Sequence, residues 1–151
     1  MRVWRLTQSR HAAFDGEGAR LFGGRWNHRG TPLVYTSSAL SLAAMELLVH
    51  VDDEDLAENY VALAADIPDS VEITRARASD LPRDWRTLPR PQALADLGSR
   101  WAAAHATAVL AVPSAVILQE LNYLLNPLHR YFKRIRIGRP EPFSFDPRLW
   151  R

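Results

Sequence analysis

Cysteine is entirely missing from this chain of 151 residues. Its absence excludes disulfide bonds, zinc sites with thiolate ligands and thiol nucleophiles, and it suits a reducing compartment. Histidine is present but sparse, and the spacings between the histidines are not those of metal ligands. We therefore expect no bound metal at the five histidines, which are His11, His28, His50, His105 and His129.

Long hydrophobic runs are also absent. The N-terminal residues Met1–Leu6 include two arginines and lack the apolar core of a signal peptide. The longest apolar stretch, residues 39–51, is interrupted by Ser41, Glu46 and His50, so it is too short and too polar to span a membrane. We expect a cytoplasmic protein without a membrane segment.

The chain carries little excess charge, because its formal net charge is only +2. This argues against a general nucleic-acid-binding protein. Lys133 is the only lysine, and the basic residues near the C-terminus are otherwise arginines, which suit bidentate contacts to phosphate. That cluster fits either an anion-binding surface or a solvated strand face, and it consists of Arg130, Lys133, Arg134, Arg136 and Arg139.

The size and the residue pattern predict a single α+β domain over residues 1–151. Hydrophobic residues make up 47% and charged residues 24%, as in ordinary globular proteins. Strands are expected at 3–6, 33–36, 60–67, 71–74, 109–112, 130–137 and 143–145, and helices at 37–51 and 92–105. Residues 116–125 fit either type, 11–24 are expected to form a functional loop, and 81–91 a surface connection.

Glu46 is the most informative single residue, because it lies in the apolar sequence 40–50. A helix there is apolar on almost every side and is expected to be buried. A lone carboxylate on such a helix is unfavourable by a few kcal/mol unless it is paired or hydrogen-bonded. Two interpretations stay open at this point: Glu46 faces a functional cleft, or it forms a structural ion pair with an arginine or His50.

A second feature is the sequence Gly-Gly-Arg-Trp-Asn at positions 23–27. The glycines permit a tight turn and close approach to a ligand. Arg25 beside Trp26 can bind a phosphate and stack on a ring, or the segment can be a turn with a structural tryptophan. A dinucleotide-binding fingerprint is not indicated, since Gly16 and Gly18 have no good strand before them and no helix after them.

Two further residues are candidates for substrate contact. Tyr35 closes the predicted strand before the Glu46 helix and can stack on a flat ring, although a core tyrosine is the commoner outcome. Ser114 follows the predicted strand 109–112 and can cap a helix or bind substrate. It is not framed as Gly-x-Ser-x-Gly, so a nucleophile elbow is not supported.

Taken in order, these sequences resemble the RES domain, a family named for its arginine, glutamate and serine. The resemblance rests on the ordered set of motifs over residues 3–149: Trp-Arg-Leu at 4–6, Gly-Ala-Arg-Leu-Phe-Gly-Gly-Arg-Trp-Asn at 18–27, Leu-Val-Tyr-Thr at 33–36, Met-Glu-Leu-Leu-Val-His at 45–50, Val-Pro-Ser-Ala at 112–115, Asn-Tyr-Leu-Leu-Asn-Pro at 122–127 and Phe-Asp-Pro-Arg-Leu at 145–149.

The resemblance implies a fold like that of ADP-ribosyltransferases such as diphtheria toxin. It further implies a bacterial toxin that depletes NAD⁺ by hydrolysis or phosphorolysis of the bond to nicotinamide, so NAD⁺ is a substrate and no cofactor is expected. RES proteins are usually encoded beside an Xre-type antitoxin. An Xre-family antitoxin and a homodimer within the toxin–antitoxin complex are therefore the partners that the resemblance implies.

The same resemblance assigns roles to individual residues. Arg25, Tyr35 and Glu46 correspond to the family's catalytic trio, and Arg25 replaces the histidine of diphtheria-like enzymes. Glu46 would stabilise the oxocarbenium ion that develops on the ribose, and Tyr35 would stack on nicotinamide. Arg25 would also bind the pyrophosphate. Substrate binding is assigned to Arg5, which would share the pyrophosphate, and to Ser114 and Asn126.

Two other functions remain possible at this stage. The same site could transfer ADP-ribose to a host protein, because the choice of acceptor depends on loop shapes that the sequence does not display. The chain could also be a non-catalytic module that binds nucleic acid through its C-terminal basic cluster, but this leaves Glu46 unexplained, and no nucleic-acid-binding motif is present.

Overall fold

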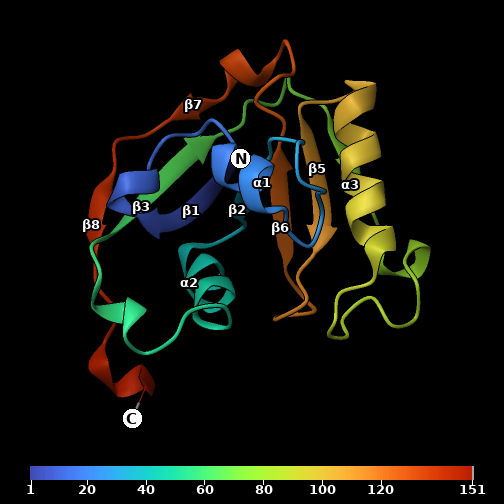
Figure 1. Ribbon diagram of the computed structural model, residues 1–151. Helices are drawn as coiled ribbons and strands as arrows, with labels where there is room; N and C mark the ends of the chain where they lie inside the picture. The colour runs from blue at the N-terminus through green and yellow to red at the C-terminus, as the bar shows by residue number, and fades with distance from the viewer. Residues whose placement is uncertain (151) are drawn as a thin grey trace.

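The longest strand pairing joins β1 (Arg2–Gln8) to β3 (Tyr60–Asp66) in the computed structural model, which describes residues 1–150. The two strands run antiparallel, and their alternating sequences place small and branched apolar side chains on both faces. Two short strands, β7 (Arg136–Ile137) and β8 (Glu141–Phe143), pair with the other edge of β3. These strands form one half of the sheet (Figure 1).

The other half of the sheet contains β2 (Val34–Ser37), β4 (Ile73–Arg75), β5 (Val109–Pro113) and β6 (Leu121–Leu125). The strand order is β4-β5-β6-β2-β1-β3-β7, and only β4 and β5 pair in parallel. A single residue pair, Trp4 with Ser37, joins β1 to β2, so the two halves meet at a narrow seam. This mixed sheet confirms the α+β class.

Three α-helices accompany the sheet: α1 (Glu17–Phe22), α2 (Leu40–Leu48) and α3 (Gln92–Ala104). In Figure 1, α3 lies along the β5 side and α2 lies beside the seam, below β1 and β2. Single 3₁₀ turns occur at Ser9–His11, Asp55–Ala57, Ala78–Asp80, Phe132–Arg134 and Pro147–Trp150. Among residues 1–150, no helix is long and apolar enough to cross a membrane.

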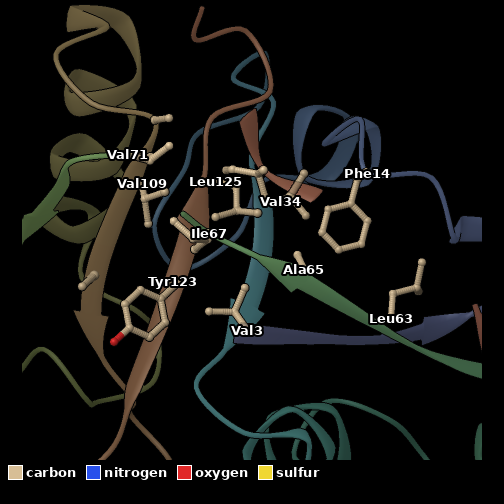
Figure 2. Packing of buried hydrophobic residues seen from close by; sticks show 13 residues of the cluster. Val3, Phe14, Val34, Leu63, Ala65, Ile67, Val71, Val109, Tyr123 and Leu125 are labelled. Atoms are coloured by element: carbon tan, nitrogen blue, oxygen red, sulfur yellow. The ribbon is translucent and has the colours of Figure 1, made fainter. Parts of the chain in front are cut away.

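The main hydrophobic cluster lies on one face of the sheet, where strands of both halves contribute (Figure 2). Val3 of β1 and Val34 of β2 are fully buried there, together with Leu125 of β6. Phe14, from the segment before α1, covers this cluster from one side. Burial of apolar surface at about 25 cal/mol per Å² therefore holds the two halves together despite their single register pair.

Two further clusters lie between the sheet and its long helices. Leu94 and Trp101 of α3 pack with Leu110 and Leu124, which alternate along β5 and β6 with residues of the main cluster. Ala43 of α2 packs with residues of β1 and β3 in the third cluster. Alternation of side chains along the strands thus provides each helix with its own apolar surface.

Three details differ from the sequence-based expectations, and one segment that the sequence left open is now defined. Residues 17–22 form a helix directly after Gly16, although no helix was expected there. Residues 130–137 are a 3₁₀ turn and a two-residue strand instead of one strand. The ambiguous segment 116–125 is a turn followed by β6. The connection 81–91 is not merely superficial, because Trp85 is buried against α3 in the second cluster.

Candidate active site

Glu46 lies on α2 and points toward the ends of β5 and β6. Its Oε1 accepts two hydrogen bonds of 2.6 Å, one from the Ser114 hydroxyl and one from the Asn122 side-chain amide. No residue in the range 1–150 donates to Oε2. The carboxylate is half-buried, and α2 is only partly covered, since Met45 and Val49 are exposed. The helix, which was expected to be buried, is therefore buried only where Leu42 and Ala43 lie, and it has an open side next to Glu46.

Ser114 connects Glu46 to the turn that follows β5. The side chain is fully buried, and its hydroxyl oxygen accepts hydrogen bonds from the backbone N–H groups of Val116 (3.1 Å) and Ile117 (2.9 Å). Those two bonds use the oxygen as acceptor, so its single proton is directed to Glu46. A turn of backbone thus fixes the serine, and the serine fixes one oxygen of the carboxylate.

Asn122 of β6 is held from its other side by β2. Ser37 stands opposite Asn122 in the β2–β6 register, and its hydroxyl donates to Oδ1 of Asn122 at 2.7 Å. The amide N–H₂ group is therefore turned toward Glu46. Neither Ser37 nor Asn122 was among the predicted site residues. Asn122 does lie in one of the motifs shared with the RES domain, but nothing in its local sequence indicates a contact with Glu46.

The glycine-rich segment is tied to β2 through Tyr35. The Tyr35 hydroxyl donates to Oδ1 of Asn27 at 2.6 Å and accepts from the Trp26 backbone N–H at 3.1 Å. A Cβ at Gly24 would lie 2.6 Å from that hydroxyl, so only glycine allows this approach. Burial raises the pKa of Tyr35 above its usual value, so the hydroxyl stays protonated as a donor.

Arg25 projects from this segment into the same region. Its Nη1 donates to the backbone carbonyl of Trp85 at 2.9 Å. Burial is the main cause that lowers the pKa of Arg25; the charge of Arg90 lowers it further, while Glu46 opposes the shift. The charges of Tyr35, Glu46 and Arg90 thus act on Arg25, and those of Arg25 and Arg90 act on Tyr35.

Two predicted site residues, Arg5 and Asn126, form no hydrogen bond with this group within residues 1–150. The Arg5 guanidinium of β1 lies 5.9 Å from the centre of the Phe14 ring and donates weakly to the His11 carbonyl at 3.4 Å. Its buried Nε has no hydrogen-bond acceptor within residues 1–150. Asn126 lies beyond the other end of β6. Its amide donates to the Ala102 carbonyl and its Oδ1 accepts from the Leu128 N–H, so it joins the turn after β6 to α3.

Trp26 and the C-terminal basic cluster also lie outside the site. Trp26 is only 2% exposed and packs against α3, so the structural interpretation of this tryptophan is correct. In the basic cluster, Arg134 and Arg130 stack on Tyr131, with guanidinium-to-ring distances of 4.0 and 4.6 Å. Within residues 1–150, no group of three or more His, Asp or Glu side chains is placed to hold a metal ion.

The chain is similar to proteins of a known family. The family model of the RES domain matches residues 2–146. A protein named Toxin Res from Yersinia enterocolitica is 37% identical over 152 residues, with 99% of each chain covered. A protein from Sphingobium sp. named Prs ADP-ribosylating toxin is 35% identical over 154 residues and covers 98% of this chain and 96% of its own.

Among solved structures, the Mycobacterium tuberculosis MbcT–MbcA toxin–antitoxin complex contains a chain of similar fold. The TM-score is 0.77, the sequence identity is 18%, and the alignment covers 95% of this chain and 84% of the other. At this identity the likeness concerns the fold alone. It extends over nearly the whole chain.

Proposed function

Since the chain belongs to the RES domain family, we propose that it is the toxin of a bacterial toxin–antitoxin pair and that it consumes NAD⁺ as a substrate. The reaction breaks the bond between the nicotinamide nitrogen and C1 of the ribose. The bonding electron pair leaves with nicotinamide, and an oxygen of water or of inorganic phosphate bonds to C1. With water, one proton is released together with ADP-ribose.

The observation that supports this proposal most is the way in which Glu46 is held. Both of its donors bind Oε1, and Oε2 keeps its acceptor capacity. As the nicotinamide leaves, positive charge develops on the ribose, and a fixed carboxylate oxygen stabilises that charge or binds a ribose hydroxyl. Because Ser114 and Asn122 restrain the carboxylate in advance, little reorganisation is needed at the moment of reaction.

The other site residues fit binding roles in the same reaction. Tyr35 is only partly buried and its hydroxyl is fixed by Asn27 and Trp26, which fits a ring held in place to stack on nicotinamide. Arg25 keeps guanidinium donors beyond the one bound to Trp85, and these suit the pyrophosphate. Arg5 retains a buried Nε–H without an acceptor, which supports its proposed contact with an anionic group.

The substitution Glu46→Gln tests the proposal with a matched control. It keeps the shape and removes the charge, and we expect nicotinamide release to fall at least about 100-fold, the loss seen when one electrostatic group is removed from an active site. Glu72→Gln, at an exposed position with no side-chain partner among residues 1–150, should behave as wild type. Release is followed by chromatography with and without inorganic phosphate. A Glu46→Gln protein with wild-type turnover would contradict the proposal.

A second candidate function, transfer of ADP-ribose to a protein, is favoured by the name of the Sphingobium relative. The same Glu46 geometry supports it, with a side-chain nucleophile as acceptor in place of water or phosphate. Incubation with NAD⁺ labelled in the adenylate part and with cell lysate separates the two activities. A labelled protein band indicates transfer, whereas free ADP-ribose or its phosphate ester indicates depletion of NAD⁺.

The proposal also includes the partners implied by the family: a cognate Xre-family antitoxin and a homodimer within the complex. The solved toxin–antitoxin complex of similar fold supports the search for such a partner. Co-expression with the adjacent open reading frame, followed by size-exclusion chromatography with light scattering, measures the stoichiometry. An antitoxin should co-elute with this chain and suppress nicotinamide release.

A further inference from the structure

A cleft of about 240 Å³ opens between the glycine-rich segment and the N-terminal end of α3. Its lining includes Arg25 and Arg29 from the first segment and Arg90 from the connection that precedes α3. None of the lining residues is acidic; Asp96 reaches the cleft edge only through its pair with His28. The cleft is therefore lined by positive charge from two separate parts of the chain.

Several arginines lie close enough to Arg25 for their charges to act on it. Arg86 and Arg90 both act on Arg25 as like charges, and Glu46 is the carboxylate that opposes them. Arg25, Arg86 and Arg90 against Glu46 leave a formal charge of +2, and Arg29 at the cleft wall adds one more positive charge. Among the residues that the structure describes, none of Arg25, Arg86 and Arg90 forms an ion pair. Like charges near one another repel, so a bound anion would be stabilised here.

Hydrogen bonds to backbone carbonyls hold two of these arginine side chains in place. Arg25 is anchored by its bond to the Trp85 carbonyl, and Arg86 is anchored by a 3.0 Å bond from its Nε to the Ala115 carbonyl, next to Ser114. Arg90 has no partner in residues 1–150. At the cleft wall, α3 begins at Gln92, and no side chain caps this end. The positive end of the helix dipole adds to the field of the arginines.

We propose that Arg90 and Arg25 clamp a phosphate group in this cleft, with the uncapped start of α3 behind it. This rests on the proposed function, and the phosphate group belongs either to the diphosphate of NAD⁺ or to inorganic phosphate acting as acceptor. Phe22 lines the same cleft and is 74% exposed, so it presents an aromatic face to a nucleobase beside the phosphate. Arg90 is then a substrate-binding residue that lies outside the motifs shared with the RES domain.

The proposed clamp is tested by measuring the binding of phosphate-containing probes that the protein does not turn over. Inorganic pyrophosphate, inorganic phosphate and ADP-ribose are each titrated calorimetrically into the wild-type protein, into Arg90→Gln and into Arg83→Gln. Arg83 is the matched control, because it is exposed in the same connection and has no side-chain partner among residues 1–150. We expect Arg90→Gln to weaken binding of at least one of these probes at least tenfold, and Arg83→Gln to leave all of them unchanged.

Steady-state kinetics then identify the source of the phosphate. If Arg90→Gln raises KM for NAD⁺ and leaves KM for inorganic phosphate unchanged, the clamp holds the dinucleotide; the reverse result assigns it to the acceptor. Wild-type affinity of Arg90→Gln for all three probes, or an equal loss in Arg83→Gln, would overturn the clamp. A protein that binds pyrophosphate through Arg90 but releases no nicotinamide would contradict only the proposed function.

Discussion

The side-chain amide of Asn122 donates a hydrogen bond of 2.6 Å to Oε1 of Glu46 and is itself oriented by the Ser37 hydroxyl. Three secondary-structure elements, α2, β2 and β6, thus determine the direction of one carboxylate. An amide in this position is a donor without charge, so it restrains Glu46 and leaves the negative charge available for the substrate. The arrangement makes Asn122 a positioning residue.

Replacement of Asn122 by aspartate should disable the site while changing few atoms. The new carboxylate would face Oε1 of Glu46 at hydrogen-bond distance, where two negative charges repel each other, and the lost bond to a charged group is worth about 1.5–3 kcal/mol. We expect kcat for nicotinamide release at pH 7 to fall at least tenfold, with partial recovery at lower pH, where one of the two carboxylates is protonated. The exposed Asn59→Asp serves as control. A kcat within twofold of wild type would show that Asn122 does not position Glu46.

Ser114→Ala should affect both stability and activity. The substitution removes the donor to Glu46 and leaves the N–H groups of Val116 and Ile117 without their acceptor. Buried groups that lose a hydrogen-bond partner destabilise a fold by about 1–3 kcal/mol each. We expect a loss of at least about 1 kcal/mol in the free energy of urea unfolding, together with lower nicotinamide release. Ser70→Ala, in an exposed turn, should change neither quantity, and an equal effect there would refute the assignment.

Tyr35→Phe should change the dependence of stability on pH. Burial raises the pKa of Tyr35 in the folded protein, whereas an unfolded tyrosine ionises near pH 10. Above about pH 10 the unfolded chain loses this proton and the folded chain retains it, so the free energy of unfolding falls as the pH rises.

In Tyr35→Phe this decrease should be smaller, because that ionisation is absent. The protein should also be less stable at pH 7 by about 1–3 kcal/mol, since Asn27 and Trp26 lose their partner. Urea unfolding between pH 7 and pH 11 measures both effects. Identical slopes above pH 10 in the two proteins would contradict a buried, protonated Tyr35.

Two glycine-to-alanine substitutions should have opposite effects on stability. A Cβ at Gly98 of α3 would overlap the backbone carbonyl of Trp26, so Gly98→Ala must displace the helix or the glycine-rich segment. We expect a loss of at least about 2 kcal/mol, in the upper range of overpacking substitutions, and a higher KM for NAD⁺. Gly18 of α1 has open space around it, and Gly18→Ala should stabilise the protein by about 0.5–1 kcal/mol. Thermal unfolding compares the two variants with wild type.

Local patterns were sufficient for much of the fold. The predicted helices at 37–51 and 92–105 contain α2 and α3, and the predicted strands at 33–36, 60–67 and 109–112 overlap β2, β3 and β5. The periodicity of apolar residues indicates how a single segment packs. It does not predict secondary structure that depends on contacts outside that segment. Residues 17–22 are helical although Gly16 and Gly23 border the segment and Gly18 lies within it. Hydrogen bonds from the Gly30 N–H to the Arg20 carbonyl and from the Asn27 side chain to the Ala19 carbonyl hold it against the loop that follows.

The candidate site was predictable only in part, for the same reason. Arg25, Tyr35 and Glu46 stood out from their local sequences and received their roles from the family resemblance. The structure places Glu46 and Tyr35 close enough for their charges to act on Arg25. Asn122 and Arg90 were not found, because their importance arises from side-chain contacts that cross the sheet or from a cleft between separate segments. Of the two asparagines in the motif at 122–127, sequence reasoning selected Asn126, which the structure places in a turn against α3.

The distances along the chain between Glu46 and its two donors determine when the site can form during synthesis. Ser114 and Asn122 follow Glu46 by 68 and 76 positions, and β6 must insert between β2 and β5 before both donors can meet the carboxylate. A nascent chain that ends before Asn122 has α2 and the glycine-rich segment but no restrained carboxylate. The restrained carboxylate therefore cannot form until the chain has been synthesised through β6, because both donors and the strand that carries one of them are needed.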